Sequence, residues 1–215
     1  MSALPVDPGL YLTFLGVMAV MAATPGPANI FAVATGMARG PRAALAGVAG
    51  MNAATLVWFA AAALGLGALI AAFPAAFRII SILGAVYVGW LGLSAIWRAR
   101  RSPDGDVRAA IAAETPSRSR SALVDGFMVQ ILNPKAVLFF TAVLPPFLDL
   151  SRPAPPQLGL FALGTIGLDV MSMSAYGLGG AALALWMSRP GFRRAFDLFT
   201  GGLLILAAIL ILTRL

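Results

Sequence analysis

Long runs without a charged residue dominate the pattern of hydrophobic and polar positions along this chain. They cover residues 8–38, 43–77, 79–97, 153–168 and 170–188. A helix needs about 20 apolar residues to cross roughly 30 Å of hydrocarbon, and several of these runs reach that length. The pattern therefore predicts an all-α membrane protein. Its six transmembrane helices are expected over residues 9–37, 43–72, 76–97, 122–147, 156–187 and 195–213.

Polar motifs that contain proline interrupt the first and the fourth of these spans. The motifs are Thr24-Pro25-Gly26-Pro27-Ala28-Asn29 and Asn133-Pro134-Lys135, and they begin 109 residues apart. Proline has no backbone N–H and breaks the helical ladder, which frees backbone groups that hydrocarbon cannot satisfy. The sequence therefore predicts that the first and fourth helices are broken. Breaks in corresponding positions of two halves are typical of a transporter's binding site.

The arginines predict the topology. One set of loops carries eleven of them: Arg39, Arg42, Arg98, Arg100, Arg101, Arg108, Arg118, Arg120, Arg189, Arg193 and Arg194. The other side has only Arg78, Arg152 and Arg214. By the positive-inside rule, the basic loops are cytoplasmic and both termini are periplasmic. The net charge of +7 is then explained by orientation in the lipid bilayer, and no nucleic-acid partner is expected.

An odd number of spans on each side of the long polar loop predicts two halves of opposite orientation. We expect residues 1–97 to form a first three-helix repeat, residues 98–121 a cytoplasmic linker, and residues 122–215 a second, inverted three-helix repeat. Small residues recur every four positions in several spans, for example at Ser81, Ala85 and Gly89. Such spacing lets helices approach closely, which predicts a packed bundle and leaves room for a homodimer.

The two breaks supply most of the candidate binding residues. The helix that restarts after the first break presents free N–H groups and a positive dipole end, which suit a carboxylate. Lys135 lies about 20 Å into its span, where an ammonium should face a cavity or a partner. A simple proline kink and a lysine that snorkels to the far interface are the alternatives. The predicted substrate-binding residues are Thr24, Pro25, Gly26, Pro27, Asn29, Asn52, Gln130, Asn133, Pro134, Lys135 and Tyr176.

Asp169 is the most isolated acid in the chain, because only apolar residues and glycine surround it in the fifth span. A carboxylate at that depth can carry a proton or meet a substrate ammonium, so we expect Asp169 to be the proton-coupling residue. The alternative is a static Asp169–Lys135 ion pair that only holds helices together. Three further acids near span ends are expected to be structural, namely Asp125, Asp149 and Asp197.

Composition narrows the chemistry. The chain is 60% hydrophobic and 11% charged, and it contains neither cysteine nor histidine. We therefore expect no metal site and no cofactor, and an intramembrane enzyme is disfavoured because the commonest general base and the thiol nucleophile are both missing. Ser172 and Ser174 near Asp169 are the remaining candidates for a nucleophile, and serines in membrane helices usually bond to the backbone.

The motifs resemble those of the LysE/RhtB superfamily of amino-acid exporters over nearly the whole chain. The resemblance rests on Thr24-Pro25-Gly26-Pro27, on Asn133-Pro134-Lys135-Ala136 followed by Leu138-Phe139-Phe140, and on Gly84-Ala85-Val86-Tyr87 with Gly89 through Gly92. It implies a secondary active exporter of amino acids or close derivatives in the bacterial inner membrane. Proton-coupled antiport with alternating access is the implied mechanism, so an amino acid and H+ are the expected partners.

One position departs from the superfamily pattern. Many members carry an acid in the second span, near the place where this chain has Asn52, so the resemblance leaves more of the coupling role to Asp169. A passive channel, or an exporter of another small solute or a metal ion, is the alternative function. A metal pathway should show several carboxylates, histidines or cysteines in the spans, and this chain offers essentially Asp169.

Overall fold

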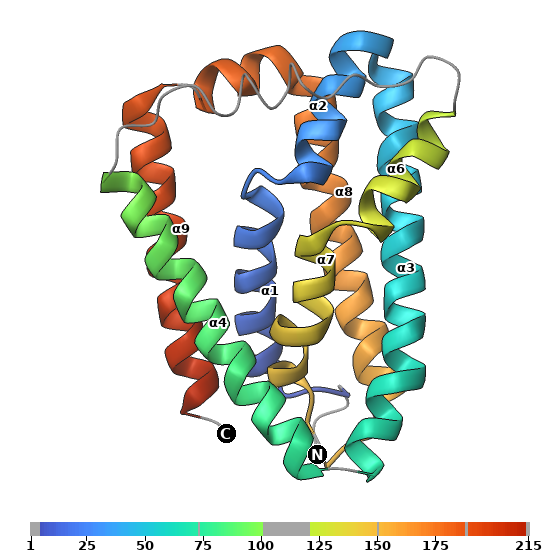
Figure 1. The fold of residues 1–215 in the computed structure, drawn as a ribbon, viewed down its shortest axis with the longest axis vertical. Helices are drawn as coiled ribbons and strands as arrows, with labels where there is room; N and C mark the ends of the chain where they lie inside the picture. Colours follow the sequence, from blue (N-terminus) through green and yellow to red (C-terminus); the bar gives the residue numbers. More distant parts are fainter. Residues whose placement is uncertain (1–4, 73, 101–120, 150, 188, 214–215) are drawn as a thin grey trace.

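The computed structural model describes residues 5–72, 74–100, 121–149, 151–187 and 189–213, and it places no strand among them. The elements are α1 (Pro8–Ala23), α2 (Pro27–Arg39), α3 (Pro41–Ala72), α4 (Pro74–Arg100), α6 (Ala122–Ile131), α7 (Pro134–Leu138), the π-helical turn η1 (Phe139–Val143), the 3₁₀ turn η2 (Pro145–Phe147), α8 (Ala154–Met187) and α9 (Pro190–Leu212) (Figure 1). These bounds agree with the six predicted spans to within five residues. The predicted all-α membrane fold is confirmed, whereas most of the predicted linker lies outside the described residues.

Both predicted breaks are present as sharp bends. Helices α1 and α2 meet at 47°, and α6 meets the segment Pro134–Phe147 at 46°. Each bent pair is long and apolar enough to form one span, as are α3, α8 and α9. Helix α4 has 27 residues, which at 1.5 Å per residue makes it about 40 Å long. The prediction of broken first and fourth helices is therefore confirmed.

Local sequence explains where the helices begin and end. The Asp7 side chain accepts a hydrogen bond from the Leu10 N–H at 2.8 Å and so caps α1. Proline stands at the start of α1, α2, α7 and α9, where its missing N–H costs nothing. Gly40 joins α2 to α3 with φ of 84°, a conformation that only glycine adopts readily, and this allows the chain to reverse within one residue.

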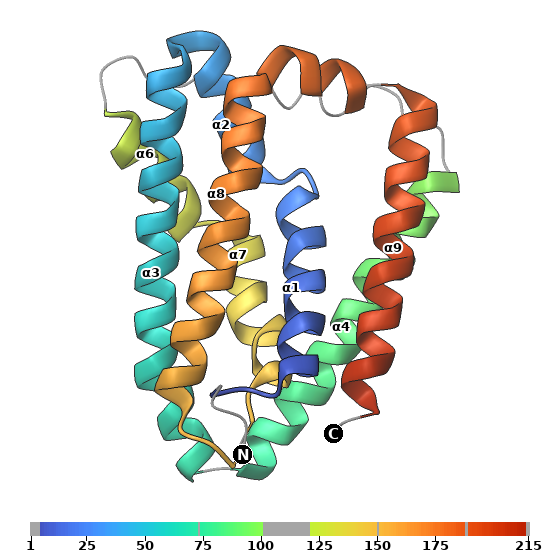
Figure 2. The ribbon, with the colours of Figure 1, turned by 180° about the vertical axis from the view of Figure 1, so that it is seen from behind.

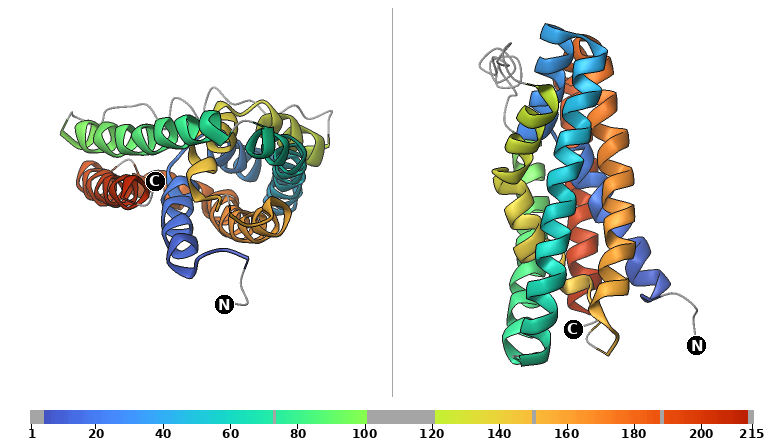
Figure 3. Two further views of the ribbon diagram at one scale, coloured as in Figure 1. Left: turned by 90° about the horizontal axis from the view of Figure 1, so that it is seen from below. Right: turned by 90° about the vertical axis from the view of Figure 1, so that its right-hand side faces the viewer.

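Close glycine contacts hold neighbouring helices together. A Cβ atom on Gly92 of α4 would lie 2.7 Å from the Gly201 carbonyl oxygen of α9, and the reverse substitution would meet Gly92 at the same distance. On α3, a Cβ on Gly50 would lie 1.9 Å from the Leu123 carbonyl oxygen of α6. Seen from one end, α4 and α9 form a pair beside the remaining helices (Figure 3). Small residues therefore pack helices within the chain, as their spacing predicts.

The two ends of the bundle differ in charge. The start of α1, the end of α9 and the connection before α8 share one end, here called the terminal end (Figures 1 and 2). The opposite end, here called the basic end, holds the C-terminus of α2, the N-terminus of α3 and the N-terminus of α9, which bear Arg39, Arg42 and Arg193. This arrangement is the one that the arginine pattern predicts.

An aromatic core fills the bundle toward the terminal end. The Phe14 ring lies 4.5 Å from the Phe161 ring and 5.3 Å from the Phe147 ring, measured between centroids. Phe59, Phe139 and Phe140 extend the cluster. A second, smaller core toward the basic end contains Phe31, Met51 and Met173. The candidate site lies between these two cores.

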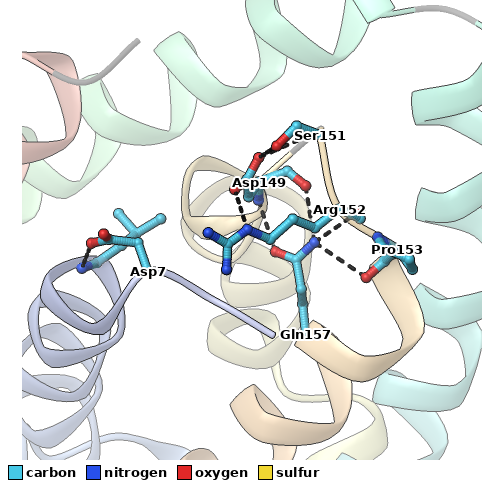
Figure 4. A network of polar contacts seen from close by, with 7 residues as sticks. Asp7, Asp149, Ser151, Arg152, Pro153 and Gln157 are labelled. Atoms are coloured by element: carbon cyan, nitrogen blue, oxygen red, sulfur yellow. Dashed lines mark hydrogen bonds and ion pairs between the residues drawn. The ribbon is translucent and has the colours of Figure 1, made fainter. Parts of the chain in front are cut away.

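A buried glutamine organises the loop before α8 (Figure 4). The Gln157 Nε2 group donates to the carbonyl oxygens of Asp149 at 2.9 Å and Arg152 at 3.1 Å, and its Oε1 accepts from the Asp149 N–H at 2.8 Å. The Asp149 carboxylate also pairs with the Arg152 guanidinium at 2.9 Å. Gln157 is fully buried, so its amide satisfies backbone groups of the loop that water cannot reach.

The surroundings of Asp149 in this loop favour its charged form and lower its pKa. The Ser151 hydroxyl is the main group that holds the pKa of the Asp149 carboxyl below its ordinary value, against the opposing effect of burial. The stabilisation that this carboxylate contributes is therefore fully present above its ordinary pKa. It is lost as the pH falls through the lowered pKa of the folded state.

Gln157→Leu is expected to lower the free energy of unfolding by about 1–3 kcal/mol, because it leaves buried backbone groups without partners. For a chain of 215 residues this corresponds to a fall in melting temperature of about 2–4 °C per kcal/mol. Thermal unfolding in detergent measures the effect. Thr141→Val, at an exposed position outside this loop, is the control and should change stability little. Equal stability of the two variants would contradict the role given to Gln157.

Candidate functional site

A small cavity, lined partly by polar side chains, lies at the level of the two breaks. Its volume is about 40 Å³, enough for a few water molecules and far below the roughly 300–1,000 Å³ of ordinary ligand pockets. The lining residues come from α1, α2, α3, α6, α7, η1 and α8: Met18, Met21, Ala22, Gly26, Ala28, Asn29, Thr55, Gln130, Asn133, Lys135, Ala136, Phe139, Phe140, Thr165, Asp169 and Met173. Parts of both broken spans thus face one chamber, and that chamber must widen to admit a solute larger than water.

The C-terminus of α1 ends at this cavity with its free carbonyl groups satisfied by side chains. The Asn29 amide donates to the Ala22 carbonyl at 3.0 Å, and the Ser172 hydroxyl donates to the same oxygen at 2.6 Å. The Tyr176 hydroxyl donates to the Ala23 carbonyl at 2.8 Å. A helix end leaves carbonyls without intrahelical partners, and these bonds from α2 and α8 replace the water that a membrane interior lacks.

Lys135 completes this cap. Its Nζ donates to the carbonyl oxygens of Met21 and of Thr24, the latter at 3.0 Å. An ammonium at a helix C-terminus also complements the negative end of the helix dipole. Lys135 therefore joins the break of the fourth span directly to the break of the first. The snorkelling alternative is wrong, because the ammonium reaches α1 at mid-span and not the far interface.

A chain of hydrogen bonds fixes the second break. The Asn133 side chain caps α7 by accepting from the Lys135 N–H at 3.0 Å. Its amide donates to the Gln130 Oε1 at 3.0 Å, and the Gln130 amide donates to the Thr55 hydroxyl of α3 at 3.1 Å. All three side chains are buried, so the chain of bonds sets the position of the α7 N-terminus, and hence of Lys135, relative to α3.

Asp169 lines the cavity without a partner. It is 5% exposed, and its carboxylate makes no hydrogen bond or ion pair with any residue that the structure describes. Lys135 is near enough to interact with it electrostatically, yet the two side chains are not within the 4.0 Å of an ion pair. The alternative of a static Asp169–Lys135 pair is therefore wrong for this conformation, in which Lys135 is bound to α1.

The first turn of α2 offers unused donors to the same cavity. The Ile30 N–H donates to the Gly26 carbonyl at 2.9 Å, whereas the N–H groups of Ala28 and Asn29 take part in none of the bonds among the described residues. Both residues are buried and line the cavity. A Cβ atom on Gly26 would lie 3.4 Å from Lys135 Cδ, at ordinary van der Waals contact, so the first break passes directly beside the lysine. The site thus has N–H donors without partners and a carboxylate without a partner.

Six of the predicted site residues line the cavity: Gly26, Asn29, Gln130, Asn133, Lys135 and Asp169. Thr24 and Tyr176 belong to the cap of α1, and Pro25, Pro27 and Pro134 shape the breaks. Asn52 is buried on α3 but does not line the cavity. Its amide donates to the Val48 carbonyl of the same helix at 2.9 Å, and its Oδ1 has no partner.

Sequence reasoning missed two polar residues of the lining, Thr55 and Thr165. Thr55 follows Asn52 by three residues and Thr165 precedes Asp169 by four. Residues at these spacings share one helix face, so the neighbouring polar residues could have pointed to them. Ser172, considered above as a nucleophile, bonds to a backbone carbonyl as serines in membrane helices usually do.

The fold and the cavity define a multi-pass helical membrane protein with a chamber at two helix breaks, lined by polar and apolar side chains. The chain belongs to the LysE family, described as LysE type translocator, which matches residues 19–215. This confirms the family that the two motifs indicate.

Several curated proteins resemble the chain over most of its length. An uncharacterized membrane protein of Vibrio cholerae is 26% identical over 97% of this chain and 98% of its own length. A homoserine/homoserine lactone efflux protein of Salmonella typhimurium is 28% identical over 94% of this chain and 95% of its own. A threonine efflux protein of Escherichia coli is 27% identical over 90% and 93%, respectively. No solved structure matches the chain.

Proposed function

We propose that this protein is a secondary active exporter of amino acids or close derivatives in the bacterial inner membrane. The names of the similar proteins support this, since they include homoserine, threonine and leucine efflux proteins. The observation that carries the proposal is the buried carboxylate of Asp169, which lines the cavity without a partner among the residues that the structure describes. A buried charge without a partner costs stability, so its presence favours a functional role.

The cavity suits both ends of a zwitterion. The free N–H groups of Ala28 and Asn29, at the positive end of the α2 dipole, would bind the α-carboxylate. Asp169 would bind the α-ammonium. Lys135 contributes positive charge beside Gly26, but it cannot bind the carboxylate directly without leaving the α1 carbonyls. Lys135, which stands among the predicted substrate-binding residues, would then act on the substrate through its charge and not through a direct bond.

Alternating access would come from two inverted repeats, residues 1–97 and 122–215. The motif offset of 109 residues recurs between Gly92 and Gly201, which meet where α4 packs on α9. It recurs again between Gly26 and Lys135, which also meet. In a protein with two related halves, a residue near the two-fold axis contacts the corresponding residue of the other half. These two pairs of corresponding residues therefore support a pseudo-two-fold axis that passes through both contacts.

An ion pair closes the basic end between the two broken spans. Arg39 at the end of α2 pairs with Asp125 in the first turn of α6 at 3.3 Å. With the basic end in the cytoplasm and both termini periplasmic, a substrate that enters from the cytoplasm must pass between these half-helices. Opening would separate Arg39 from Asp125, and the second core near Phe31 and Met51 would have to loosen.

Proton coupling would follow if the proton and the substrate compete for Asp169. A proton or a substrate ammonium can neutralise the carboxylate, but not both at once, so binding of one displaces the other. Antiport then requires the proton to return on Asp169 after the substrate has left.

The homodimer that the small-residue spacing allows stays a prediction.

Counterflow in proteoliposomes tests the proposed function. Vesicles loaded with one unlabelled amino acid are expected to accumulate the same labelled amino acid against its gradient, for at least one member of a panel. A pH gradient across the vesicle membrane should drive net transport of that amino acid. A passive channel would let the labelled amino acid equilibrate without accumulation, both in counterflow and under a pH gradient. Absence of transport for every amino acid in the panel would overturn the proposal.

A further inference from the structure

Thr165 carries a hydroxyl that the protein leaves without a partner. The residue lies on α8 one turn before Asp169, lines the same cavity and is 2% exposed. Its Oγ1 is buried and makes no hydrogen bond with any residue in the described part of the chain. A buried hydroxyl without a partner is unfavourable, because it has lost water and gained nothing in exchange. The Thr165 hydroxyl therefore calls for an explanation.

Most other threonines among the described residues avoid this situation. Their hydroxyls donate to the carbonyl four residues earlier, as in Thr13 to Gly9, Thr24 to Val20, Thr55 to Met51, Thr141 to Val137 and Thr200 to Phe196. This back-bonding is the usual solution for threonine in a helix. Thr35 also lacks a hydroxyl partner, but it does not line the cavity. Among the cavity's threonines, Thr165 alone has an unused hydroxyl in the part of the chain that the structure describes.

The position of Thr165 in the cavity suits a contact with the side chain of the proposed substrate. If Asp169 binds the ammonium and the α2 N–H groups bind the carboxylate, the substrate's side chain must meet the rest of the wall. That wall is mainly apolar and consists of Met18, Met21, Ala136, Phe139, Phe140 and Met173. Its other threonine, Thr55, already donates to Met51 and accepts from Gln130. Among the polar side chains of the cavity, only Thr165 and Asp169 make no hydrogen bond to the described residues, so the Thr165 hydroxyl is the group best placed for a substrate side chain.

We propose that Thr165 determines side-chain specificity by hydrogen bonding to a polar group on a short, uncharged side chain, such as a hydroxyl. This inference rests on the proposed export of amino acids. A site that pairs a buried hydroxyl with a substrate hydroxyl discriminates strongly against an analogue that lacks it, because the site's own group is then left unpaired. Thr165 lies one turn from Asp169 on the same helix face, so the distance between them suits a short side chain, and the apolar wall disfavours charged ones.

Matched substrate pairs test Thr165 directly. Homoserine and norvaline, threonine and valine, and serine and 2-aminobutyrate differ mainly by a hydroxyl in place of a methyl group. Counterflow competition in proteoliposomes gives the preference of the wild-type protein within each pair. The wild type should prefer the hydroxylated member in at least one pair. Thr165→Val should lower that preference by about tenfold while leaving transport of the aliphatic member unchanged or improved. Thr165→Ser should retain the preference.

Thr141→Val is the control, because Thr141 is exposed, back-bonded and outside the cavity. Thermal unfolding supplies a second measurement: Thr165→Val removes an unpartnered hydroxyl at nearly constant shape, so the variant should be at least as stable as the wild type. A loss of stability, or an equal loss of transport for both members of a pair, would show a structural role and overturn the inference. If the wild type transports no amino acid at all, the proposed function itself fails; if it transports amino acids without a hydroxyl preference, only this inference fails.

Discussion

Asp169→Asn is expected to abolish transport driven by a pH gradient and to leave the fold intact. The asparagine has nearly the same shape but cannot exchange a proton or pair with an ammonium. Because Asp169 makes no hydrogen bond or ion pair with the described residues, the substitution breaks no bond of that kind. It also removes a charge from a buried position, which should leave stability equal or slightly higher.

The expected loss for Asp169→Asn is large, because a desolvated charge pair contributes about 2–5 kcal/mol to binding, or at least about 30-fold in affinity. Initial rates of gradient-driven uptake and the melting temperature should be measured on the same preparation. Asp149→Asn is the matched control, since it changes a carboxylate that pairs with Arg152 in the loop at the terminal end. If Asp169→Asn kept full gradient-driven transport, or lost stability in proportion to transport, Asp169 would be structural.

The span boundaries and the breaks follow from short-range sequence features. The length of the apolar stretches predicts α3 and α8, and Pro25 and Pro134 predict the bends, because proline acts within one turn of its own helix. The isolation of Asp169 among apolar residues likewise marks it as unusual in any helical fold. These are the features that the sequence alone predicts well.

The partner of Lys135 could not be predicted in the same way. Its ammonium binds carbonyls 114 and 111 residues earlier in the chain, at Met21 and Thr24. Sequence reasoning considered a carboxylate or an anion as the partner, because only those are visible as residue types. A helix C-terminus is an equally good acceptor, but its position depends on how the first span packs against the fourth. The same limit hid the roles of Ser172 and Tyr176, whose acceptors on α1 are 150 and 153 residues away.

Lys135→Met is expected to destabilise the protein and to stop export together, in contrast to Asp169→Asn. Methionine keeps most of the length of the side chain but has no hydrogen-bond donor. The backbone carbonyls of Met21 and Thr24 therefore lose the hydrogen bonds that Lys135 donates. A buried acceptor left unpaired costs about 1–3 kcal/mol, and the charge complementarity with the α1 dipole is lost as well. The break between α1 and α2 should therefore lose its defined geometry, and with it the position of the α2 N–H groups that face the cavity.

Ser172→Ala is the matched control, because it removes one donor from the same helix end where another remains. The Ala22 carbonyl keeps its bond from Asn29, so this variant should retain most of its stability and transport. Melting temperature in detergent and counterflow in proteoliposomes separate the two variants. If Lys135→Met were as stable as Ser172→Ala and still failed to transport, the lysine would act on the substrate itself, and its cap on α1 would be incidental. If Lys135→Met behaved as the wild type in both measurements, the hydrogen bonds from Lys135 to α1 would contribute to neither stability nor transport. The burial of this lysine beside the cavity would then need another explanation.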